Sequence, residues 1–420
     1  MEQREVEEPL SILLINQYAG SPTLGMEHRP HWMSQRWLES GNAVTVVAGS
    51  YSHLRRTNPQ DVGMRSARDV DGVPFVWIGT SRYRGNGFAR VLSMIEFGSM
   101  LDRRLGDSLV DAPDVVIASS THPFDVRASW RLARKFGALF VMEIHDLWPL
   151  TPQLLGGYKP SHPLIRFMQR EADFGYQNAD LIVSILPGTA DYLQSRGMPE
   201  GNWTCIPNGW SPSQHAVPVS AATASAMRDL RLAFPFVIAY AGGFGLSNVL
   251  DELLDSASDL AAAGIAVALA GDGPRSGELR HRYGDEANIE FVGRLESAQV
   301  PNFLELADAG YLGVPDSPLY RHGISPNKIF DYMGAAKPIL FVGEAFGNPV
   351  EAADCGVVVR SRQQLVEGAK RLARMSPSER ASLGGSGHSY LKRNHSRALL
   401  SDRFLEALHA TRERRPAAAR

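Results

Sequence analysis

The feature that most constrains the fold is a series of short runs of valine, isoleucine and leucine, separated by helical sequence. Strands that are apolar on every residue are covered on both faces, as in parallel sheets. Strand, loop, helix and strand in succession form the βαβ unit that starts a doubly wound sheet. The first series comprises residues 10–17, 43–48, 75–79, 114–120, 139–146 and 180–186.

A stretch rich in proline, serine, asparagine and glycine interrupts this series, and a second α/β series follows it. Because 420 residues are too many for one core, we predict two doubly wound, Rossmann-like domains that face a cleft at the carboxyl ends of their sheets. The last helix should cross back to the first domain. The predicted segments are a disordered tail (1–9), a first domain (10–207), a linker (208–226), a second domain (227–395) and the returning helix with its tail (396–420).

Charge and cysteine content narrow the function classes. The net charge is −2, so no global basic field indicates a nucleic-acid partner. Cys205 and Cys355 lack metal-ligand spacing, which favours a reducing compartment without a disulfide framework. The chain starts MEQREVEEPL, charged where a secretory signal is apolar, and contains no apolar run of membrane-spanning length. We expect a cytoplasmic protein.

One predicted helix leaves a membrane contact open. Residues 88–105 carry apolar Phe88, Leu92, Ile95 and Met100 among several arginines. Such a helix can lie on anionic lipid, or it can be an amphipathic helix that faces the core.

The segment HGISPNKIFDYM, residues 322–333, contains the strongest candidate site. Ser325 is placed to cap a helix that begins at Pro326, and the free N–H groups of that turn attract anions. Lys328 adds a positive charge, and Asp331 lies on the same helix face, where a carboxylate can accept hydrogen bonds from ribose hydroxyls. This arrangement indicates a diphosphate and ribose site. The alternative is a surface ion pair between Lys328 and Asp331.

Glycine-rich loops follow several strands of the second domain. The loop AGGFGLSN places Gly242, Gly243 and Gly245 where backbone can approach phosphate. GDGP, with Asp272, and VGR, with Gly293 and Arg294, also end strands there. Each loop can equally be an ordinary turn.

In the first domain, EIHDLWP places His145 and Asp146 at the end of a strand. An imidazole and a carboxylate there can bind sugar hydroxyls or help to deprotonate an acceptor, or they can simply cap a helix. The loop after the first strand, with Gly25, should face the cleft. The D-x-D sequence Asp69–Asp71 continues into glycine and indicates a turn, so we predict no metal site.

Together, the segments INQYAGSPTLGMEHRP, IPNGW, GDGP, FVGR and SPNKIFDYM resemble glycosyltransferase family 4, which has the two-domain GT-B fold. The resemblance covers nearly the whole chain. SPNK-x-F-D-Y-M followed by KPI is similar to bacterial transferases that build surface polysaccharides from acetamido sugars, including N-acetyl-fucosamine.

The resemblance implies transfer of a sugar from a nucleoside diphosphate sugar, with retention of anomeric configuration and without a metal or cofactor. The second domain would bind the donor and the first the acceptor. Asp331 matches the second glutamate of the family's E-x7-E motif, Gly323 stands at the first, and Asn248 stands near a family lysine. The predicted catalytic residues are His145, Asp146 and Lys328. The predicted donor-binding residues are Gly25, Gly242, Gly243, Gly245, Asn248, Asp272, Gly293, Arg294, His322, Gly323, Ser325, Asn327, Lys328 and Asp331.

We therefore predict a hexosyltransferase that moves an acetamido hexose or 6-deoxyhexose from a UDP-linked donor to a lipid-linked or saccharide acceptor. It would act in cell-surface polysaccharide synthesis, in the cytoplasm or at the inner face of the plasma membrane. Two alternatives are a UDP-N-acetylglucosamine 2-epimerase-like enzyme of the same fold and a degenerate subunit that only binds nucleotide sugar. Gly323 and Asn248 favour the second of these.

Overall fold

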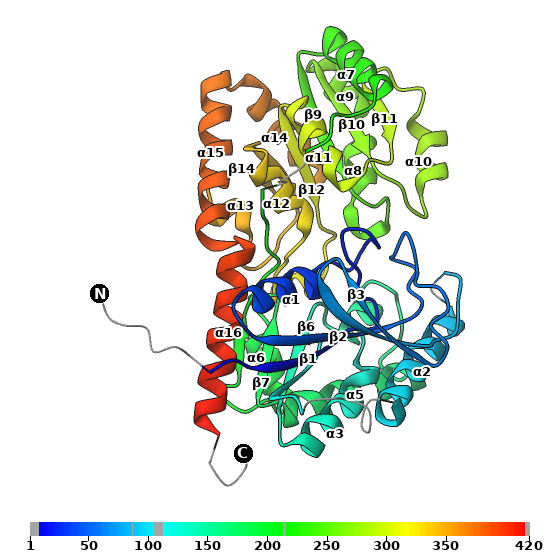
Figure 1. Ribbon diagram of the computed structural model, residues 1–420. Coiled ribbons are helices and arrows are strands. Elements are labelled where there is room, and N and C mark those ends of the chain that lie inside the picture. Colours follow the sequence, from blue (N-terminus) through cyan, green and yellow to red (C-terminus); the bar gives the residue numbers. More distant parts are fainter. Residues whose placement is uncertain (1–7, 86, 105–111, 213–215, 416–420) are drawn as a thin grey trace. The chain divides into compact units, whose positions relative to one another are not determined.

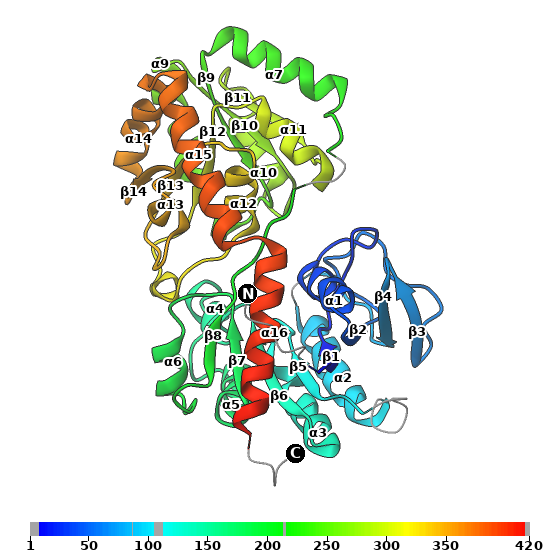
Figure 2. The ribbon, with the colours of Figure 1, turned by 60° about the vertical axis from the view of Figure 1, so that its left-hand side comes forward.

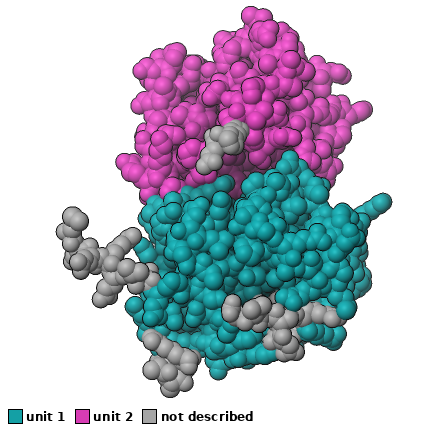
Figure 3. Space-filling model, viewed as in Figure 1, with its two compact units in different colours: residues 1–207, 397–420 teal, residues 208–396 magenta. Residues whose placement is uncertain are grey.

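The structure is a computed structural model that describes residues 8–85, 87–104, 112–212 and 216–415 (Figure 1). The chain divides into two compact units, unit 1 (residues 1–207 and 397–420) and unit 2 (residues 208–396), shown in different colours in Figure 3. Each unit is a doubly wound α/β fold, which confirms the predicted fold class. The predicted tail at 1–9 falls almost entirely outside the described residues.

Unit 1 is built on an eight-stranded sheet, within the described ranges, of order β3-β4-β2-β1-β5-β6-β7-β8. All neighbouring strands are parallel except β3 and β4. Its strands are β1 (Ser11–Ile15), β2 (Ala43–Gly49), β3 (Arg65–Val70), β4 (Val73–Ile78), β5 (Val115–Ala118), β6 (Leu139–Ile144), β7 (Leu181–Ser184) and β8 (Trp203–Cys205).

The apolar runs identified six of these strands, and the sequence analysis missed β3 and β8. The sequence of β3, RSARDV, has three charged residues and no apolar run, because three residues of this edge strand are exposed and three are half-buried. The turn predicted at Asp71-Gly72 connects β3 to β4, with positive φ at both residues. An antiparallel edge hairpin therefore replaces the purely parallel edge that we expected.

The helices of unit 1 cover both faces of its sheet (Figure 2). They are α1 (Arg29–Glu39), α2 (Phe88–Arg104), the short η1 (Pro123–Asp125), α3 (Val126–Phe136), α4 (Leu150–Leu154), α5 (Pro163–Asn178), α6 (Ala190–Ser195) and the C-terminal α16 (Arg397–Arg414). Helix α3 ends at Gly137, which adopts the left-handed conformation that favours glycine at this position.

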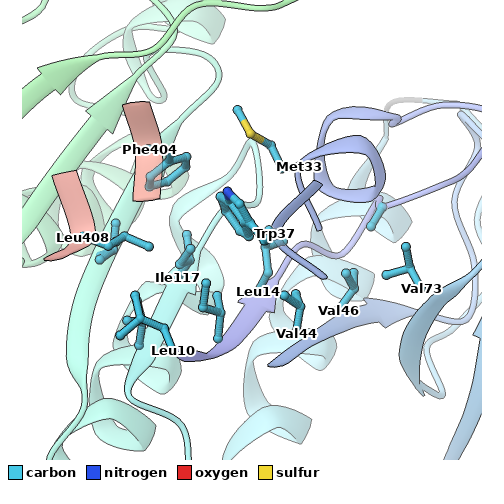
Figure 4. Packing of buried hydrophobic residues seen from close by; sticks show 14 of the residues in the cluster. Leu10, Leu14, Met33, Trp37, Val44, Val46, Val73, Ile117, Phe404 and Leu408 are labelled. Carbon is cyan, nitrogen blue, oxygen red and sulfur yellow. The ribbon is translucent and has the colours of Figure 1, made fainter. Parts of the chain in front are cut away.

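Helix α16 returns to unit 1, as predicted, and completes its core (Figure 4). The rings of Phe404 and Trp37 on α1 pack edge to face, with centroids 5.2 Å apart. The indole N–H of Trp37 donates to the carbonyl oxygen of Ser401 over 3.2 Å. Leu400 and Leu408 are also fully buried, and each such side chain contributes about 2 kcal/mol of burial free energy.

Unit 2 has a six-stranded parallel sheet, counted over the residues described, of order β11-β10-β9-β12-β13-β14. This is the dinucleotide-fold order 3-2-1-4-5-6. Its strands are β9 (Phe236–Ala241), β10 (Ile265–Ala270), β11 (Ile289–Gly293), β12 (Ala309–Gly313), β13 (Ile339–Val342) and β14 (Gly356–Val359).

The helices of unit 2 begin within the predicted linker. Helix α7 (Ala221–Ala233) starts at Ala221 because the hydroxyl of Ser220 accepts a hydrogen bond from the Thr223 N–H and caps it. The predicted linker at 208–226 is thus too long at its C-terminal end. The other helices are η2 (Leu246–Asn248), α8 (Leu250–Leu254), α9 (Ala257–Ala262), α10 (Ser276–Tyr283), η3 (Ser297–Gln299), α11 (Val300–Glu305), η4 (Pro318–His322), α12 (Asn327–Gly334), α13 (Pro349–Ala352), α14 (Arg362–Arg374) and α15 (Pro377–Asn394).

Candidate active site

The sheet of unit 2 has its topological switch point between β9 and β12, because β10 and β11 lie beyond β9 while β13 and β14 lie beyond β12. Open α/β sheets bind ligands at the carboxyl ends of the strands at this point. The glycine loop 242–248 follows β9, and the connection after β12 leads through η4 to α12. The topology therefore brings the two strongest sequence motifs of this unit together.

Lys328, in the first turn of α12, reaches the glycine loop after β9. Its Nζ donates a hydrogen bond to Oδ1 of Asn248 over 2.6 Å. The Nδ2 of Asn248 donates in turn to the carbonyl oxygen of Gly243 over 2.9 Å. A Cβ atom at position 242 would lie only 2.6 Å from Cε of Lys328. Gly242 therefore makes room for the lysine, a role that the sequence analysis did not predict.

The electrostatic environment of Lys328 favours binding of an anion. Burial lowers the pKa of Lys328 to about 8, although the Asp331 carboxylate one turn along the helix acts in the opposite direction. The amine donates to a neutral amide, and its Nζ lies 5.3 Å from the centre of the Tyr240 ring. The predicted alternative, a surface ion pair with Asp331, fits this arrangement less well. A buried ammonium gains most from a ligand that carries full negative charge.

Ser325 does not cap α12, which corrects the sequence prediction. The helix begins at Asn327, and Pro326 takes the N-cap position with an extended backbone. The hydroxyl of Ser325 instead accepts from the backbone N–H of Asn208 over 2.8 Å, and Nδ2 of Asn208 donates to the Ser325 carbonyl over 2.8 Å. Because Pro326 has an extended ψ of 133°, the first residue with helical backbone is Asn327. Ser325 thus fixes the entry to α12.

Gly323 occupies a position where the backbone itself disfavours the carboxylate that the resemblance placed there. It follows η4, which ends at His322, and has φ of 98° and ψ of −178°. A glutamate with positive φ and this ψ would be strained, because this region is open essentially only to glycine. The departure from the family pattern at this position therefore has a local conformational cause.

Of the other predicted donor residues in unit 2, His322 ends η4 and Asn327 begins α12, whereas Asp272, Gly293 and Arg294 lie at the same edge of the sheet but farther from the switch point. Asp272 follows β10, and its Oδ1 accepts from the N–H of Gly273 over 2.8 Å and from the Ser276 hydroxyl over 2.6 Å. Arg294 is exposed directly after Gly293 at the end of β11. Since β11 is two strands from β9, Arg294 starts about 10 Å from the glycine loop. Direct donor contacts of these residues, and of Gly245, stay predictions.

Unit 1 contains a buried charge cluster at the end of β6. The side chain of Glu143 is 2% exposed, and its Oε1 accepts from Nε of Arg29 over 2.9 Å. Its Oε2 accepts from the Ser119 hydroxyl over 2.6 Å and lies 3.2 Å from Nε2 of His145. Burial alone would raise the pKa of Glu143, but Arg29 and His145 outweigh it and hold that pKa well below its ordinary value.

The sequence analysis missed both Arg29 and Glu143. Arg29 also donates to the carbonyl oxygens of Ile206 and Pro207, over 2.8 and 2.7 Å, and thereby anchors the last residues of the first segment of unit 1. The available signal was a single glutamate in the otherwise apolar strand LFVMEI. A charged residue in a fully buried strand requires a buried partner.

The structure separates the two predicted catalytic residues of unit 1. His145 Nε2 lies 2.9 Å from the Ser119 hydroxyl, within the buried cluster. Asp146 accepts instead from Thr151 Oγ1 over 2.5 Å and from Trp148 Nε1 over 3.3 Å, which holds the turn into α4. Burial raises the pKa of Asp146. Asp146 therefore bonds side chains of that turn without capping α4, and catalytic roles for His145 and Asp146 both stay predictions.

A polar aromatic cluster, which the sequence analysis also missed, lies beyond the carboxyl ends of β1, β2 and β4. The hydroxyl of Tyr83 lies 2.8 Å from Nδ1 of His53, and Nε of Arg90 donates to the Tyr18 hydroxyl over 3.3 Å. Burial and Arg90 lower the pKa of His53 to about 4, so its imidazole is neutral at physiological pH. Neutral rings and hydroxyls of this kind suit the recognition of a sugar.

Gly25 lies in the loop after β1, where it exchanges two backbone hydrogen bonds with Ser21 of 2.8 and 3.0 Å. Its donor contact stays a prediction. Within the part of the chain that the structure describes, no three histidine, cysteine, aspartate or glutamate side chains gather as a metal site. Asp71 accepts from the Thr23 hydroxyl and N–H instead.

Comparison with known proteins agrees with this geometry. Residues 25–209 match the glycosyl transferase 4-like domain. The probable glycosyltransferase WbjE of Pseudomonas aeruginosa is 22% identical over 332 residues, which are 77% of this chain and 80% of that protein.

Among solved structures, sucrose-phosphate synthase of Thermosynechococcus elongatus aligns with a TM-score of 0.71 at 16% identity, over 96% of this chain and 99% of that one. Alr3699/HepE of Anabaena, solved in complex with UDP and glucose, aligns with a TM-score of 0.66 at 13% identity, over 96% and 100%. These likenesses show the shared fold. With the domain matched over residues 25–209 and the WbjE relative, they support a glycosyltransferase of the family 4 type with the GT-B fold.

Proposed function

We propose that this glycosyltransferase moves an acetamido hexose or 6-deoxyhexose from a UDP-sugar to a lipid-linked or saccharide acceptor, with retention and without a metal. The product would belong to a cell-surface polysaccharide or glycoconjugate. The observation that carries the proposal is the partly buried amine of Lys328, held at the switch point of unit 2 by the neutral side chain of Asn248.

The donor diphosphate would take the place of the Asn248 amide as the partner of Lys328. The N-terminal N–H groups of α12 add a favourable field for the same phosphates. Asp331, one turn along, would accept hydrogen bonds from the ribose hydroxyls. Alr3699/HepE, which was solved with UDP and glucose, supports the choice of a UDP-linked donor for a chain of this fold.

In the proposed reaction, the acceptor oxygen forms a bond to the anomeric carbon on the face from which the diphosphate leaves. The bond between that carbon and the phosphate oxygen breaks, and the acceptor proton passes to the departing phosphate oxygen. Lys328 stabilises the negative charge that develops on the diphosphate. This route needs no carboxylate nucleophile, consistent with the glycine at position 323.

Acceptor binding is proposed for the carboxyl edge of the unit 1 sheet. His145 and the cluster of Tyr18, His53, Tyr83 and Arg90 offer imidazoles, hydroxyls and one cation there. These groups can orient a sugar hydroxyl by hydrogen bonds.

A membrane contact through α2 fits a lipid-linked acceptor. Helix α2 buries Met94 and Phe97 against unit 1, so the core-facing alternative holds for one side of the helix. Its other side exposes Phe88, Leu92 and Ile95, with Phe88 75% exposed. No helix among the described residues is long and apolar enough to cross a membrane. We therefore propose peripheral attachment at the inner face of the plasma membrane.

Two measurements test the proposal. The first compares the melting temperature of the protein with each member of a panel of nucleotide sugars, and the second measures UDP release in the presence of acceptor. Bound ligand raises the melting temperature, and the responsive sugar identifies the donor. Lys328→Met should abolish the response. Lys337→Met is the matched control, because burial also lowers the pKa of Lys337, whose amine contacts the carbonyl oxygens of Glu305 and Ala307.

The same experiment decides between the alternatives. Stabilisation by UDP-sugars with UDP release only in the presence of acceptor supports the transferase. Conversion of the donor sugar without acceptor, seen by proton NMR, would establish the epimerase instead. Stabilisation without turnover under any acceptor condition would identify a degenerate binding subunit.

A further inference from the structure

The strands on either side of the switch point of unit 2, β9 and β12, separate before β9 ends. The pairing of β9 with β12 stops at Ala239, whereas its pairing with β10 continues to Ala241. The backbone N–H of Ala241 donates to the hydroxyl oxygen of Tyr332 on α12 over 3.2 Å. This tyrosine therefore supplies the hydrogen bond at the residue from which the glycine loop 242–248 departs.

Two more tyrosine hydroxyls hold the backbone of the loop itself. The hydroxyl of Tyr240 on β9 donates to the carbonyl oxygen of Gly243 over 2.6 Å. The hydroxyl of Tyr311 on β12 donates to the carbonyl oxygen of Val249, directly after the loop, over 2.7 Å. Both tyrosine side chains are fully buried. Because a buried polar group that loses its partner is costly, these hydroxyls fix the loop near its start and at its end.

Two glycines on β12 make room for the tyrosines. A Cβ atom at position 310 would lie 2.5 Å from Cγ of Tyr332. A Cβ atom at position 313 would lie 2.5 Å from the hydroxyl oxygen of Tyr311. A larger residue at either position would push a tyrosine away from the backbone group that it bonds. The end of β12 is therefore built around these two rings.

Val249 ends the loop in a conformation that valine disfavours. Its φ is 50° and its ψ is 40°, in the left-handed region. A β-branched residue is strained there, and such strain persists only where the surrounding structure imposes it. Tyr311 bonds the carbonyl oxygen of this same residue, so its hydroxyl helps to impose the strained conformation. Strain of this kind is typical of ligand-binding segments.

We propose that three tyrosines are positioning residues for donor binding and hold the loop 242–248 in the shape that receives the diphosphate. They are Tyr240, Tyr311 and Tyr332. They act through the loop backbone, which they fix beside Lys328, whose amine bonds Asn248 of the same loop. A loop that is ordered in advance loses little conformational freedom on binding, and affinity is higher for that reason. The inference rests on the proposed function and assigns the shape of its donor site to these residues.

Removal of one hydroxyl tests the proposal. Tyr311→Phe keeps the ring but removes the donor to Val249, so UDP binding measured by calorimetry should weaken about tenfold. Hydrogen exchange of segment 242–249, followed by mass spectrometry, should become about tenfold faster. Tyr283→Phe is the matched control, because it removes another buried tyrosine hydroxyl of unit 2, one that bonds Oδ1 of Asp255. The control should change both quantities less than threefold.

A second substitution separates positioning from general stability. Asparagine adopts the left-handed conformation far more readily than valine, so Tyr311→Phe/Val249→Asn should bind UDP within about threefold of the wild type. Weaker UDP binding in Tyr311→Phe, with recovery in the double variant, supports the positioning role. Unchanged UDP affinity in Tyr311→Phe, equal loss in Tyr283→Phe, or no recovery in the double variant would overturn the inference while the proposed function stands. Absence of UDP binding by the wild type would overturn the proposed function, and the donor role of the loop with it.

Discussion

Arg29 in unit 1 and Lys328 in unit 2 are both shielded cations near the carboxyl ends of parallel strands, but their partners differ in charge. Arg29 bonds the carboxylate of Glu143 and two carbonyl oxygens. Lys328 bonds the neutral amide of Asn248, and its pKa is lowered to about 8. The first cation is neutralised within the fold and serves stability. The second bonds a neutral group, so a negatively charged diphosphate can bind it more strongly than Asn248 does.

The largest expected effect comes from breaking the neutralised pair. Glu143→Ala leaves the Arg29 guanidinium buried without its carboxylate, and it should lower the free energy of unfolding by about 3–5 kcal/mol. Chemical denaturation followed by circular dichroism measures this loss. Glu344→Ala removes a carboxylate that is 78% exposed and should have almost no effect. Equal stability of the two variants would contradict a structural role for the Arg29–Glu143 pair.

Removal of the second cation should affect activity without weakening the fold. Lys328→Met should lower kcat/KM for the donor at least a hundredfold, about 3 kcal/mol of transition-state stabilisation. Below pH 8 the buried ammonium destabilises the native state, because its pKa falls from 10.5 to about 8 on folding. The variant should therefore melt at the same or a higher temperature than the wild type. If Lys328→Met melted at a lower temperature but kept full activity, Lys328 would stabilise the fold, as Arg29 does, and would have no role in the reaction.

The pH dependence of donor use sharpens the comparison. As pH rises through about 8, Lys328 loses its proton, so kcat/KM for the donor should fall about tenfold between pH 8 and pH 9 or slightly above. Lys328→Arg keeps its charge over this range, so its lower activity should stay flat. Steady-state rates in a constant-ionic-strength buffer series provide the test. A parallel fall in the arginine variant would assign the titration to another group.

A smaller effect is expected from crowding the lysine. Gly242→Ala places a methyl carbon only 2.6 Å from Cε of Lys328 and should reduce kcat/KM about tenfold or less by displacing the amine. Gly277→Ala is the control, since a Cβ atom there meets nothing within 4 Å. Initial rates at subsaturating donor compare the two. Identical rates would mean that the position of Lys328 is not critical.

The smallest expected effect is that of chelation. Because a fixed amine and a helix N-terminus are proposed to neutralise the diphosphate, EDTA should leave the rate unchanged. A rate that falls on dialysis against EDTA and returns with Mg²⁺ or Mn²⁺ would contradict a metal-independent reaction.

The sequence was sufficient to predict the two doubly wound units and the returning helix, because buried parallel strands give continuous apolar runs. It missed the half-exposed edge strand β3, which has no apolar run, and the start of α12, which lies at Asn327 because Pro326 has an extended backbone. The site motifs in the glycine loop and in α12 were found because unusual residues cluster in them. Long-range partnerships left no local pattern. Arg29 and Glu143 are 114 residues apart, and Asn248 and Lys328 are 80 apart.

The central claim is that the protonated amine of Lys328 binds the donor diphosphate. Its most direct test is calorimetric titration of UDP at pH 8 in buffers of different ionisation enthalpy. A lysine with pKa near 8 is about half protonated before binding, and a bound diphosphate completes its protonation. We predict uptake of about half a proton per UDP by the wild type, and much less uptake with weaker binding by Lys328→Met. Equal affinity and equal proton uptake in both proteins would contradict the account.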